Sequence, residues 1–488
     1  MKLDKEGIEH SVNIAKQCVI SKKQYIQIKS NRYLVWPLFF MEGEQPKEDA
    51  VDVCTSALGI MSSSFFIDEN SDEMTSTVRE GVSTLLFVRN EDGSWPSKIS
   101  LVSKDNISME GVISDTYFAL FALLSINFIS NTPLINNIVD PKNNKVLSNL
   151  DDRLKIIEKS VQWLLDNRVS QGWGYTGTNY LEDRTVQNIL PAYTLPSANA
   201  VIVISEILEQ VKIVNPNFSL SDKMEQAVNE TINWICEIQN SDGGFGIKRG
   251  EKSRIGNTAR IIMALCDIVV HENLQAKVAS TLNKAVKWIL REYNPKKINF
   301  EDVSEDFSQF ILDNNNGNIS AYKRSILHET FLEPLIIDSL GKYYNKYFIN
   351  ATTATVKKSI FLKNRIALMI RSATENLMAR QKKEGVIQGA VKSRRAASNE
   401  WYTMYTCSDL ICSFRGLLNE DKLLKHVIKA SLRQKILIIV YLVFAFAIVI
   451  PVIISEQPFY LAFLALVANP VAMNIFSSIT EKLIIGDG

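Results

Sequence analysis

The stretch Ala227–Gly246 reads AVNETINWICEIQNSDGGFG, and it decides the fold of this chain. Its apolar residues Val228, Ile232 and Ile235 recur at helical spacing, which predicts an amphipathic helix. The helix is expected to end at Asn240, because the sequence NSDGG is a strong helix stop. An aromatic residue between two glycines closes the turn that follows.

This unit of a helix and a glycine-rich turn recurs at a period of roughly seventy residues. The other copies are Gly81–Trp95 (GVSTLLFVRNEDGSW), Ser160–Gly174 (SVQWLLDNRVSQGWG), Ala285–Tyr293 (AVKWILREY), which lacks the glycine turn, and Ala373–Gly385 (ATENLMARQKKEG), which keeps only its outline. Such a repeat predicts an array of similar units, each of which buries its apolar face against its neighbours.

A second and more apolar helix is predicted after each unit. These helices are Asp115–Ile126, Ser197–Leu208, Asn257–Val269, Glu329–Tyr344 and Trp401–Leu417, and an additional pair, His10–Lys22 and Asp49–Ser62, precedes them. The second helices are apolar nearly all round, so we expect them to be buried while the charged first helices lie outside. The prediction is an all-α domain of six helical hairpins over residues 1–420, with few strands and with polar loops at 136–149 and 314–318.

The turn motifs resemble the QW repeats of squalene-hopene cyclases. They are Gln239 with Asp242–Gly246 (DGGFG), Gln171–Gly174 (QGWG) and Asn90–Trp95 (NEDGSW). A ring of six hairpins is similar to the α/α toroid of terpenoid cyclases and protein prenyltransferase β subunits. The resemblance covers about residues 5–418 and implies a toroid, but a fold does not fix an activity.

The residues that perform chemistry in those families are not found here. The position of the Asp-rich acid motif corresponds to Arg254–Asn257, which holds no carboxylate, and Tyr402–Cys407 lacks the histidine of the prenyltransferase zinc site. No catalytic residue, metal or cofactor is therefore predicted, and the chain is expected not to be an enzyme. One alternative stays open: His328, with Glu329 and Glu333, is a candidate base at the start of an inner helix.

Basic residues gather in loops that lead into the inner helices, which places them on one rim of the ring. The net charge of the whole chain is only +1, so this charge is local. A rim of this kind, with helix N-termini beside it, would attract phosphates, and aromatic residues next to it would stack on bases. The predicted ligand-binding residues are Lys248, Arg249, Lys252, Arg254, Lys323, Arg324, Arg380, Lys382, Lys383, Lys392, Arg394, Arg395, Trp401, Tyr402 and Tyr405.

The end of the chain has a different composition. Residues 421–435 predict a basic juxtamembrane helix, and residues 436–482 predict a transmembrane hairpin with uncharged spans at 436–454 and 459–479. The positive-inside rule then places the toroid and both termini in the cytoplasm, on the inner membrane. A buried soluble hairpin is the alternative.

The second span carries a polar stripe. Because polar groups in lipid need a bundle interior or a water-filled pore, the stripe predicts several chains around an axis, and a plain tail anchor is the alternative. The predicted pore-lining residues are Asn469, Asn474, Ser477, Ser478 and Glu481.

Together these features predict a homo-oligomeric membrane effector, either a ligand-gated channel or a membrane-disrupting protein. The architecture resembles membrane effectors of prokaryotic anti-phage defence. Its toroid would bind an anionic ligand (a nucleotide, an oligonucleotide or a polyprenyl phosphate), and a partner protein that makes this ligand is an open possibility. The alternative is a membrane-anchored, terpenoid-cyclase-like or prenyl-transferring enzyme that acts on a polyprenyl (di)phosphate. A scaffold for docking other proteins is a third hypothesis.

Overall fold

The structure is a computed structural model. It describes residues 3–28, 30–37, 39–41, 51–67, 72–97, 99, 107–109, 111–130, 132–175, 192–294, 300–313, 318–349, 360–384 and 401–432. At residues 39–41, 107–109, 300–313, 318–331, 360 and 401–403, the description is of the backbone.

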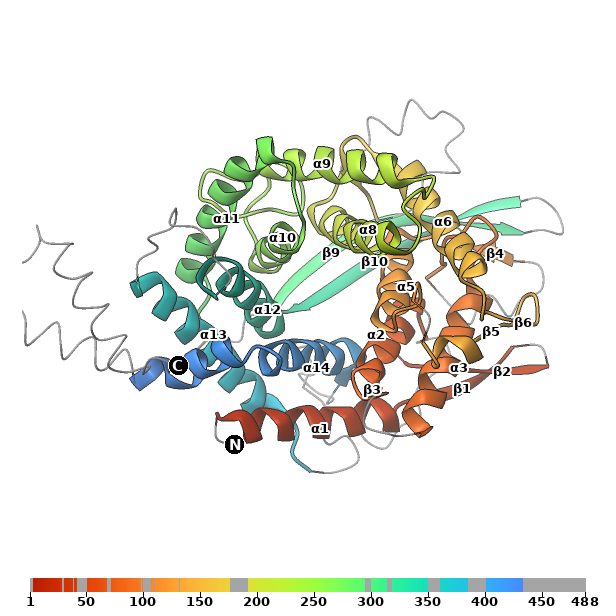
Figure 1. The fold of residues 1–488 in the computed structure, drawn as a ribbon, viewed down its shortest axis with the longest axis horizontal. Helices are drawn as coiled ribbons and strands as arrows, with labels where there is room; N and C mark the ends of the chain where they lie inside the picture. Colours follow the sequence, from red (N-terminus) through yellow and green to blue (C-terminus); the bar gives the residue numbers. More distant parts are fainter. Residues whose placement is uncertain are drawn as a thin grey trace, which may run out of the picture.

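Helices of the described chain form two concentric rings (Figure 1). Each helix of the inner ring contacts the next, and the last one returns to the first, so the inner ring is closed. In ring order the inner helices are α2 (Val53–Ser64), α5 (Ile113–Ser125), α8 (Thr194–Val214), α10 (Ile255–Asp267), α12 (Leu332–Tyr344) and α14 (Met404–Leu418). The predicted toroid is confirmed.

The outer helices alternate with the inner ones along the chain. They are α1 (Lys5–Ser21), α3 (Asp72–Val88), α6 (Leu150–Asp166), α9 (Ser221–Glu237), α11 (Glu272–Glu292) and α13 (Ile360–Arg380). Helix α1 packs chiefly on α14 and less on α2, the inner helix that follows it in the chain. The first outer helix therefore closes the ring against the last inner helix.

Each glycine-rich turn is bonded to both rings in the same way. The backbone N–H of its aromatic residue donates to a hydroxyl at the fourth position of the next inner helix, and the indole N–H, where there is one, donates to a carbonyl of the preceding outer helix. The backbone bonds are Trp95 to Thr116 (3.1 Å), Trp173 to Ser197 (2.9 Å) and Phe245 to Thr258 (2.9 Å), and the indole bonds are Trp95 to Leu85 and Trp173 to Leu164 (2.7 Å each). These bonds explain why the motif recurs: it fixes where each inner helix begins.

Glycine is required in two of these turns. Gly93 and Gly243 both have φ of 97°, a conformation that other residues rarely adopt. A Cβ atom at Gly243 would also lie 2.9 Å from the carbonyl oxygen of Lys284, on the neighbouring outer helix. The turn can therefore approach that helix only without a side chain.

Short strands and turns complete the loops. Paired strands are β1 (Gln24–Ile28) with β2 (Asn31–Val35), β3 (Phe39–Met41) with β11 (Trp401–Thr403), β5 (Val139–Asp140) with β6 (Lys145–Val146), and β7 (Arg168–Val169) with β8 (Gly172–Trp173). The short helices η3 (Ile135–Asn137) and η4 (Asn345–Ile349) and a helix at 421–432 are also present. Residues 136–149, predicted as a loop, thus hold a small hairpin.

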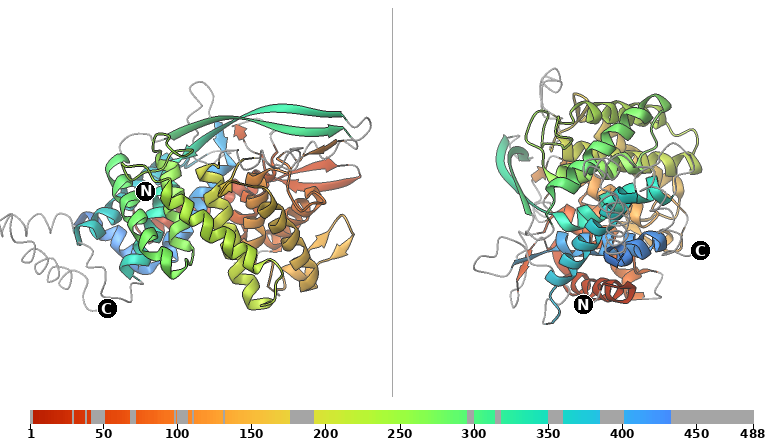
Figure 2. Two further views of the ribbon diagram at one scale, coloured as in Figure 1. Left: turned by 90° about the horizontal axis from the view of Figure 1, so that it is seen from above. Right: turned by 90° about the vertical axis from the view of Figure 1, so that its left-hand side faces the viewer.

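A long hairpin lies over the rim at which the inner helices begin (Figure 1; Figure 2, left view). It consists of β9 (Phe300–Asp313) and β10 (Asn318–Phe331), and β10 runs directly into α12. The far end of β9 pairs with β4 (Ile107–Met109), just before α5, which stands opposite α12 in the ring. Since 14 paired residues extend about 46 Å, the hairpin reaches across the mouth of the ring.

This hairpin corrects one prediction. The inner helix expected at Glu329–Tyr344 begins at Leu332, so His328 and Glu329 lie on β10. The turn at 314–317 is outside the described residues. Pairing with β9 over the whole length of β10 keeps this segment extended where its sequence alone predicted a loop and a helix start.

The predicted membrane hairpin is not supported. Its spans, 436–454 and 459–479, lie outside the described residues, and none of the helices that are described combines the length and apolar character needed to cross a bilayer. The predicted inner-membrane location and two-span topology are corrected accordingly. The pore-lining residues Asn469, Asn474, Ser477, Ser478 and Glu481 also lie outside the described residues.

Candidate functional site

A layer of polar side chains lies at one depth inside the inner ring. Arg260 and Asp409 are the sixth residues of α10 and α14, and Asp338 is the seventh residue of α12. At a rise of about 1.5 Å per residue they lie roughly 7–9 Å below the rim. Tyr117, the fifth residue of α5, and Asn199, the sixth of α8, belong to the same layer.

Interactions between helices that are not neighbours show that this layer faces the interior. The charge of Arg260 on α10 acts on Tyr117 on α5, although α8 stands between these helices. The rings of Phe118 on α5 and Tyr405 on α14 lie 6.2 Å apart, although α2 separates those helices. Asp338 and Asp409 are surrounded by protein yet remain partly accessible, as expected on the inner wall of a ring.

Three charged groups of the layer have no direct partner in the described chain. No hydrogen bond or ion pair between described residues engages the side chains of Asp338, Asp409 or Arg260, and the Nε atom of Arg260 is buried. Burying charge without a partner costs free energy. Groups left in this state are typical of functional sites, because a ligand can satisfy them.

The two carboxyl groups have unusual acidities. Burial raises the pKa of Asp338 to about 7, and the charge of Asp409 raises it further while Lys342 lowers it. Burial also raises the pKa of Asp409, to about 6, against the lowering effect of Arg260. Near neutral pH the layer therefore holds a carboxyl that can donate a proton beside one that can accept a proton.

An aromatic wall is formed by α5 and the start of α14. Tyr117 packs against Phe118 and Phe121, with ring centroids 4.9 and 6.2 Å apart, and Tyr405 lies next to Phe118. The Tyr405 hydroxyl and the Cys54 thiol are 2.6 Å apart. Burial raises the pKa of both groups, so this thiol stays protonated at neutral pH and is a poor nucleophile.

The predicted anion site at the rim remains a prediction, and the described residues place its members in different surroundings. Lys248 lies over the ring of Tyr193, with its Nζ 4.6 Å from the centroid, and Arg254 begins α10. Arg249 and Lys252 are exposed. A ligand at this rim would therefore meet exposed cations, while the ring of Tyr193 is already covered by Lys248.

Other members of the predicted set lie elsewhere. Arg380 pairs with Glu333 at 3.1 Å, and this glutamate is only 1% exposed. Tyr405 is the second residue of α14 and so stands near the rim, with its ring 6.2 Å from that of Phe118. Lys323 and Arg324 lie on β10 and Trp401 and Tyr402 on β11; Lys382 and Lys383 follow α13, while Lys392, Arg394 and Arg395 lie outside the described residues.

Asn257, at the position where the cyclases place their acid, has a structural role. Its side-chain amide donates to the carbonyl of Gly246 at 2.8 Å and so holds the glycine turn against α10. The two carboxyl groups of the layer lie about one turn deeper, on α12 and α14. Sequence reasoning missed them, although each is a single aspartate in an apolar inner helix (PLIIDSL and TCSDLIC), which is an available signal.

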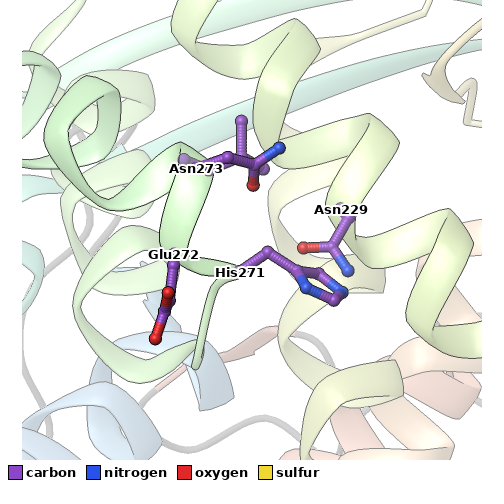
Figure 3. A pocket seen from close by; sticks show the side chains of 5 residues that line it. Asn229, His271, Glu272 and Asn273 are labelled. Atoms are coloured by element: carbon purple, nitrogen blue, oxygen red, sulfur yellow. The ribbon is translucent and has the colours of Figure 1, made fainter.

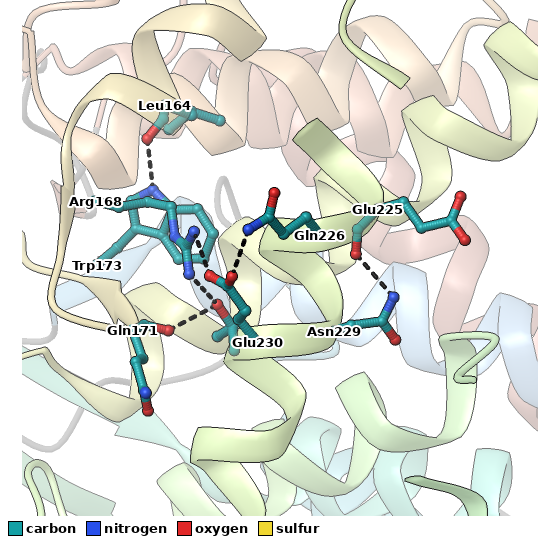
Figure 4. Close-up of polar contacts among 9 residues, drawn as sticks. Leu164, Arg168, Gln171, Trp173, Glu225, Gln226, Asn229 and Glu230 are labelled. Carbon is teal, nitrogen blue, oxygen red and sulfur yellow. Dashed lines mark hydrogen bonds and ion pairs between the residues drawn. The ribbon is translucent and has the colours of Figure 1, made fainter. Parts of the chain in front are cut away.

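A separate groove lies on the outside, where α9 and α11 begin (Figure 3). It encloses about 500 Å³ between Asn229 and His271–Leu274, and an adjoining hollow of about 410 Å³ extends along α9. Its charged groups satisfy one another. His271 and Lys212 contact Glu225 at 3.2 and 3.0 Å, and Figure 4 shows Glu230 paired with Arg168 at 3.1 Å.

These contacts make the groove a surface network that ties the β7–β8 turn to α9. The described chain contains no group of three or more potential ligands placed to hold a metal ion, here or in the interior. The interior layer is therefore the better candidate for chemistry.

Comparison with known proteins supports the fold. No protein-family model and no curated protein matches the chain. Among solved structures it is similar to the cellobiose 2-epimerase of Spirochaeta thermophila, with a TM-score of 0.53, 10% identity and coverage of 88% of this chain and 98% of that one. The cellobiose 2-epimerase of Bacillus thermoamylovorans gives a TM-score of 0.51, 9% identity, and 83% and 98% coverage. The type II terpene cyclase MstE from Scytonema gives a TM-score of 0.43 and 12% identity, with coverage of 85% of this chain and 99% of that one.

These similarities correct the expectation that the chain is not an enzyme. The cellobiose 2-epimerases are enzymes built on the α/α toroid, and the ligand-gated channel has no support among the similar structures. The Asp-rich motif and the zinc histidine are not found in this sequence, but other residues of the same ring are available for catalysis.

Proposed function

We propose that this chain is an enzyme that transfers protons to and from a carbohydrate-like substrate inside the inner ring, with Asp338 and Asp409 as its acid–base pair. The observation that supports the proposal is the pair itself. Two carboxyl groups without a direct partner in the described chain face one interior, on neighbouring helices and at nearly one depth. Their pKa values differ in the direction that separates an acid from a base.

The two aspartates have distinct roles. Asp409, with the lower pKa, is mostly ionised at neutral pH and accepts a proton. Asp338, with the higher pKa, keeps its proton more often and donates it. General acids and bases work best when their pKa lies near the working pH, which suits both groups.

The acid strength favours one class of reaction. A carboxyl with a pKa of about 7 is far too weak to protonate an alkene readily, but it exchanges protons well with oxygen atoms and with a carbon next to a carbonyl. Removal of such a proton by Asp409 and its return by Asp338 on the other face inverts the carbon. This is the change made when a sugar is epimerised at the carbon beside its carbonyl.

The aromatic and polar side chains of the inner ring suit a sugar. A pyranose has apolar faces, which would pack on Phe118 and Tyr405, and hydroxyl-bearing edges, which would meet Arg260, Asp338 and Asp409. The structurally similar cellobiose 2-epimerases act on cellobiose, and cellobiose is therefore one of the sugars to test.

The test is solvent hydrogen exchange. The purified protein is incubated in D₂O with cellobiose, D-glucose or D-glucuronate, and proton NMR follows loss of the signal at C2. We expect exchange with at least one sugar, and a loss of about 100-fold or more in rate for Asp338→Asn and for Asp409→Asn. Asp151→Asn, on an exposed turn of α6, is the matched control and should leave the rate unchanged. Failure to exchange any of the three sugars, or a wild-type rate of exchange in either interior variant, would contradict the proposal.

A terpenoid-cyclase-like activity is the second candidate, because the aromatic wall would also stabilise a carbocation. Geranylgeranyl diphosphate is the probe for it. Formation of a cyclised product from it, whether the diphosphate is retained or released, would favour this activity over sugar chemistry.

A further inference from the structure

Arg260 on inner helix α10 interacts electrostatically with Tyr117, Asp338 and Asp409, and the described residues leave its hydrogen-bonding capacity unused. Its Nε atom is buried without a hydrogen-bond partner, while the side chain as a whole is only half-buried. No ion pair within 4.0 Å joins it to a described carboxylate. By contrast, Lys342, a cation on inner helix α12, forms an ion pair with Asp267 at 2.8 Å.

This arrangement is unusual because suitable acids are close. The charge of Arg260 acts on both Asp338 and Asp409. An arginine with a carboxylate in reach ordinarily forms a two-pronged bond with it. Here the three groups stand on three helices of a closed ring, and the backbone spacing keeps them apart. The planar fork of N–H donors is thereby left open to the interior.

We infer that Arg260 binds a carboxylate of the substrate, so that the substrate is an acidic sugar of the uronic acid class. The inference rests on the proposed function and names its substrate class. A guanidinium stays charged at every working pH and matches a carboxylate in shape and in donor spacing. The sugar ring would then extend from Arg260 towards the aromatic wall and place its other carbons beside the two aspartates.

A bound carboxylate would also support the chemistry of the pair. A negative charge close to Asp338 disfavours a second negative charge there, so it raises the pKa of that carboxyl and keeps it protonated. The substrate would thus help to hold the acid in the form that donates. Neutral sugars of the same shape would lack both the bond to Arg260 and this effect.

The test compares two ligands that differ in charge and in one methyl group. Isothermal titration calorimetry measures binding of D-glucuronate and of its neutral methyl ester. We expect the wild-type protein to prefer glucuronate by about tenfold or more, the increment given by one charge-assisted hydrogen bond. Arg260→Gln should abolish the preference. Arg260→Lys should keep part of it, because it retains the charge but loses the fork. Arg249→Gln, exposed at the rim, is the matched control and should leave the preference intact.

The result of this binding test can be distinguished from the result of the proton-exchange test of the proposed function. Asp338→Asn and Asp409→Asn should reduce proton exchange while the preference for glucuronate persists. Full exchange in those two variants, with the preference intact, would refute the acid–base pair and leave the role of Arg260 standing. The inference about Arg260 is overturned if wild type binds neither ligand, binds both equally, or keeps its preference in Arg260→Gln.

Discussion

The hydroxyl of Thr116 accepts the backbone N–H of Trp95 at 3.1 Å, and this bond joins a turn of the outer layer to the first turn of an inner helix. The same bond recurs between Trp173 and Ser197. Because the repeated bond sets where inner helices begin, it also sets the depth of the side chains one turn further on. The depths of Tyr117 on α5 and of Asn199 on α8 thus follow from the turn motif.

Removing this hydroxyl should weaken the fold. We expect Thr116→Val to lower the free energy of unfolding by about 1–3 kcal/mol, because the buried N–H of Trp95 loses its acceptor. Urea denaturation followed by circular dichroism measures the change. Thr132→Val is the matched control: the Thr132 hydroxyl is buried without a partner among the described residues, so its loss should cost little. Equal losses in the two variants would contradict the role given to the bond.

The glycine turn should not tolerate a side chain. Gly243→Ala places a Cβ against the Lys284 carbonyl. It also puts an alanine at a φ of 97°, where a residue with a Cβ is strained. We expect a loss of about 2 kcal/mol or more. Gly416→Ala is the opposite case, because this glycine lies within α14 with open space around it, and a gain of up to about 1 kcal/mol is expected. Thermal unfolding of the two proteins should therefore shift in opposite directions.

The Arg380–Glu333 ion pair is predicted to be structural. Arg380→Gln leaves the carboxylate of Glu333 buried and without its cation, and we expect a loss of about 3 kcal/mol. The double variant Arg380→Gln with Glu333→Gln should recover part of that loss, because no charge is then buried. A double-mutant cycle in urea checks this. Additive losses would mean that the two residues act independently.

Stability should fall as pH rises from about 4 to 7. The folded-state pKa values of Asp338 and Asp409 lie above the usual Asp value of 3.8, so the folded chain holds protons that the unfolded chain has already released. Their contribution is complete below pH 3.8 and is lost as the pH passes through 6 and 7. Asp338→Asn should flatten this dependence by an amount on the order of 3 kcal/mol. Urea denaturation at a series of pH values, with Asp151→Asn as the control, measures it.

Activity should have a narrow pH optimum. Catalysis needs Asp409 ionised and Asp338 protonated, so the rate should rise as the pH passes 6 and fall as it passes 7. The exchange rate of the best sugar, measured across pH 4–9, checks this. A rate that keeps rising above pH 8 would show that Asp338 is not the acid.

Much of the ring could be predicted from the sequence because its signals are local. The apolar spacing in Ala227–Gly246 and the stop after it are properties of neighbouring residues. The β9–β10 hairpin was not predictable in this way. Its two strands follow each other in the chain, but the end of β9 pairs with β4, about two hundred residues earlier.

The candidate site was missed for a related reason. Asp338 and Asp409 are single aspartates in apolar helices, a local signal that does not tell whether a neighbour neutralises them. The ion pair of Arg380 with Glu333 was likewise not readable from its local sequence.

The sequence by itself determined the repeat, the alternation of charged and apolar helices, and so the toroid, since each depends on spacing within one unit. The tertiary structure alone decided which charges meet. Closure of the ring places Arg260, Asp338 and Asp409, from three different units, at nearly one depth around one interior. Charge interactions fall off over a few ångströms, so whether an aspartate is paired or left free to act depends on distances that only the closed ring sets.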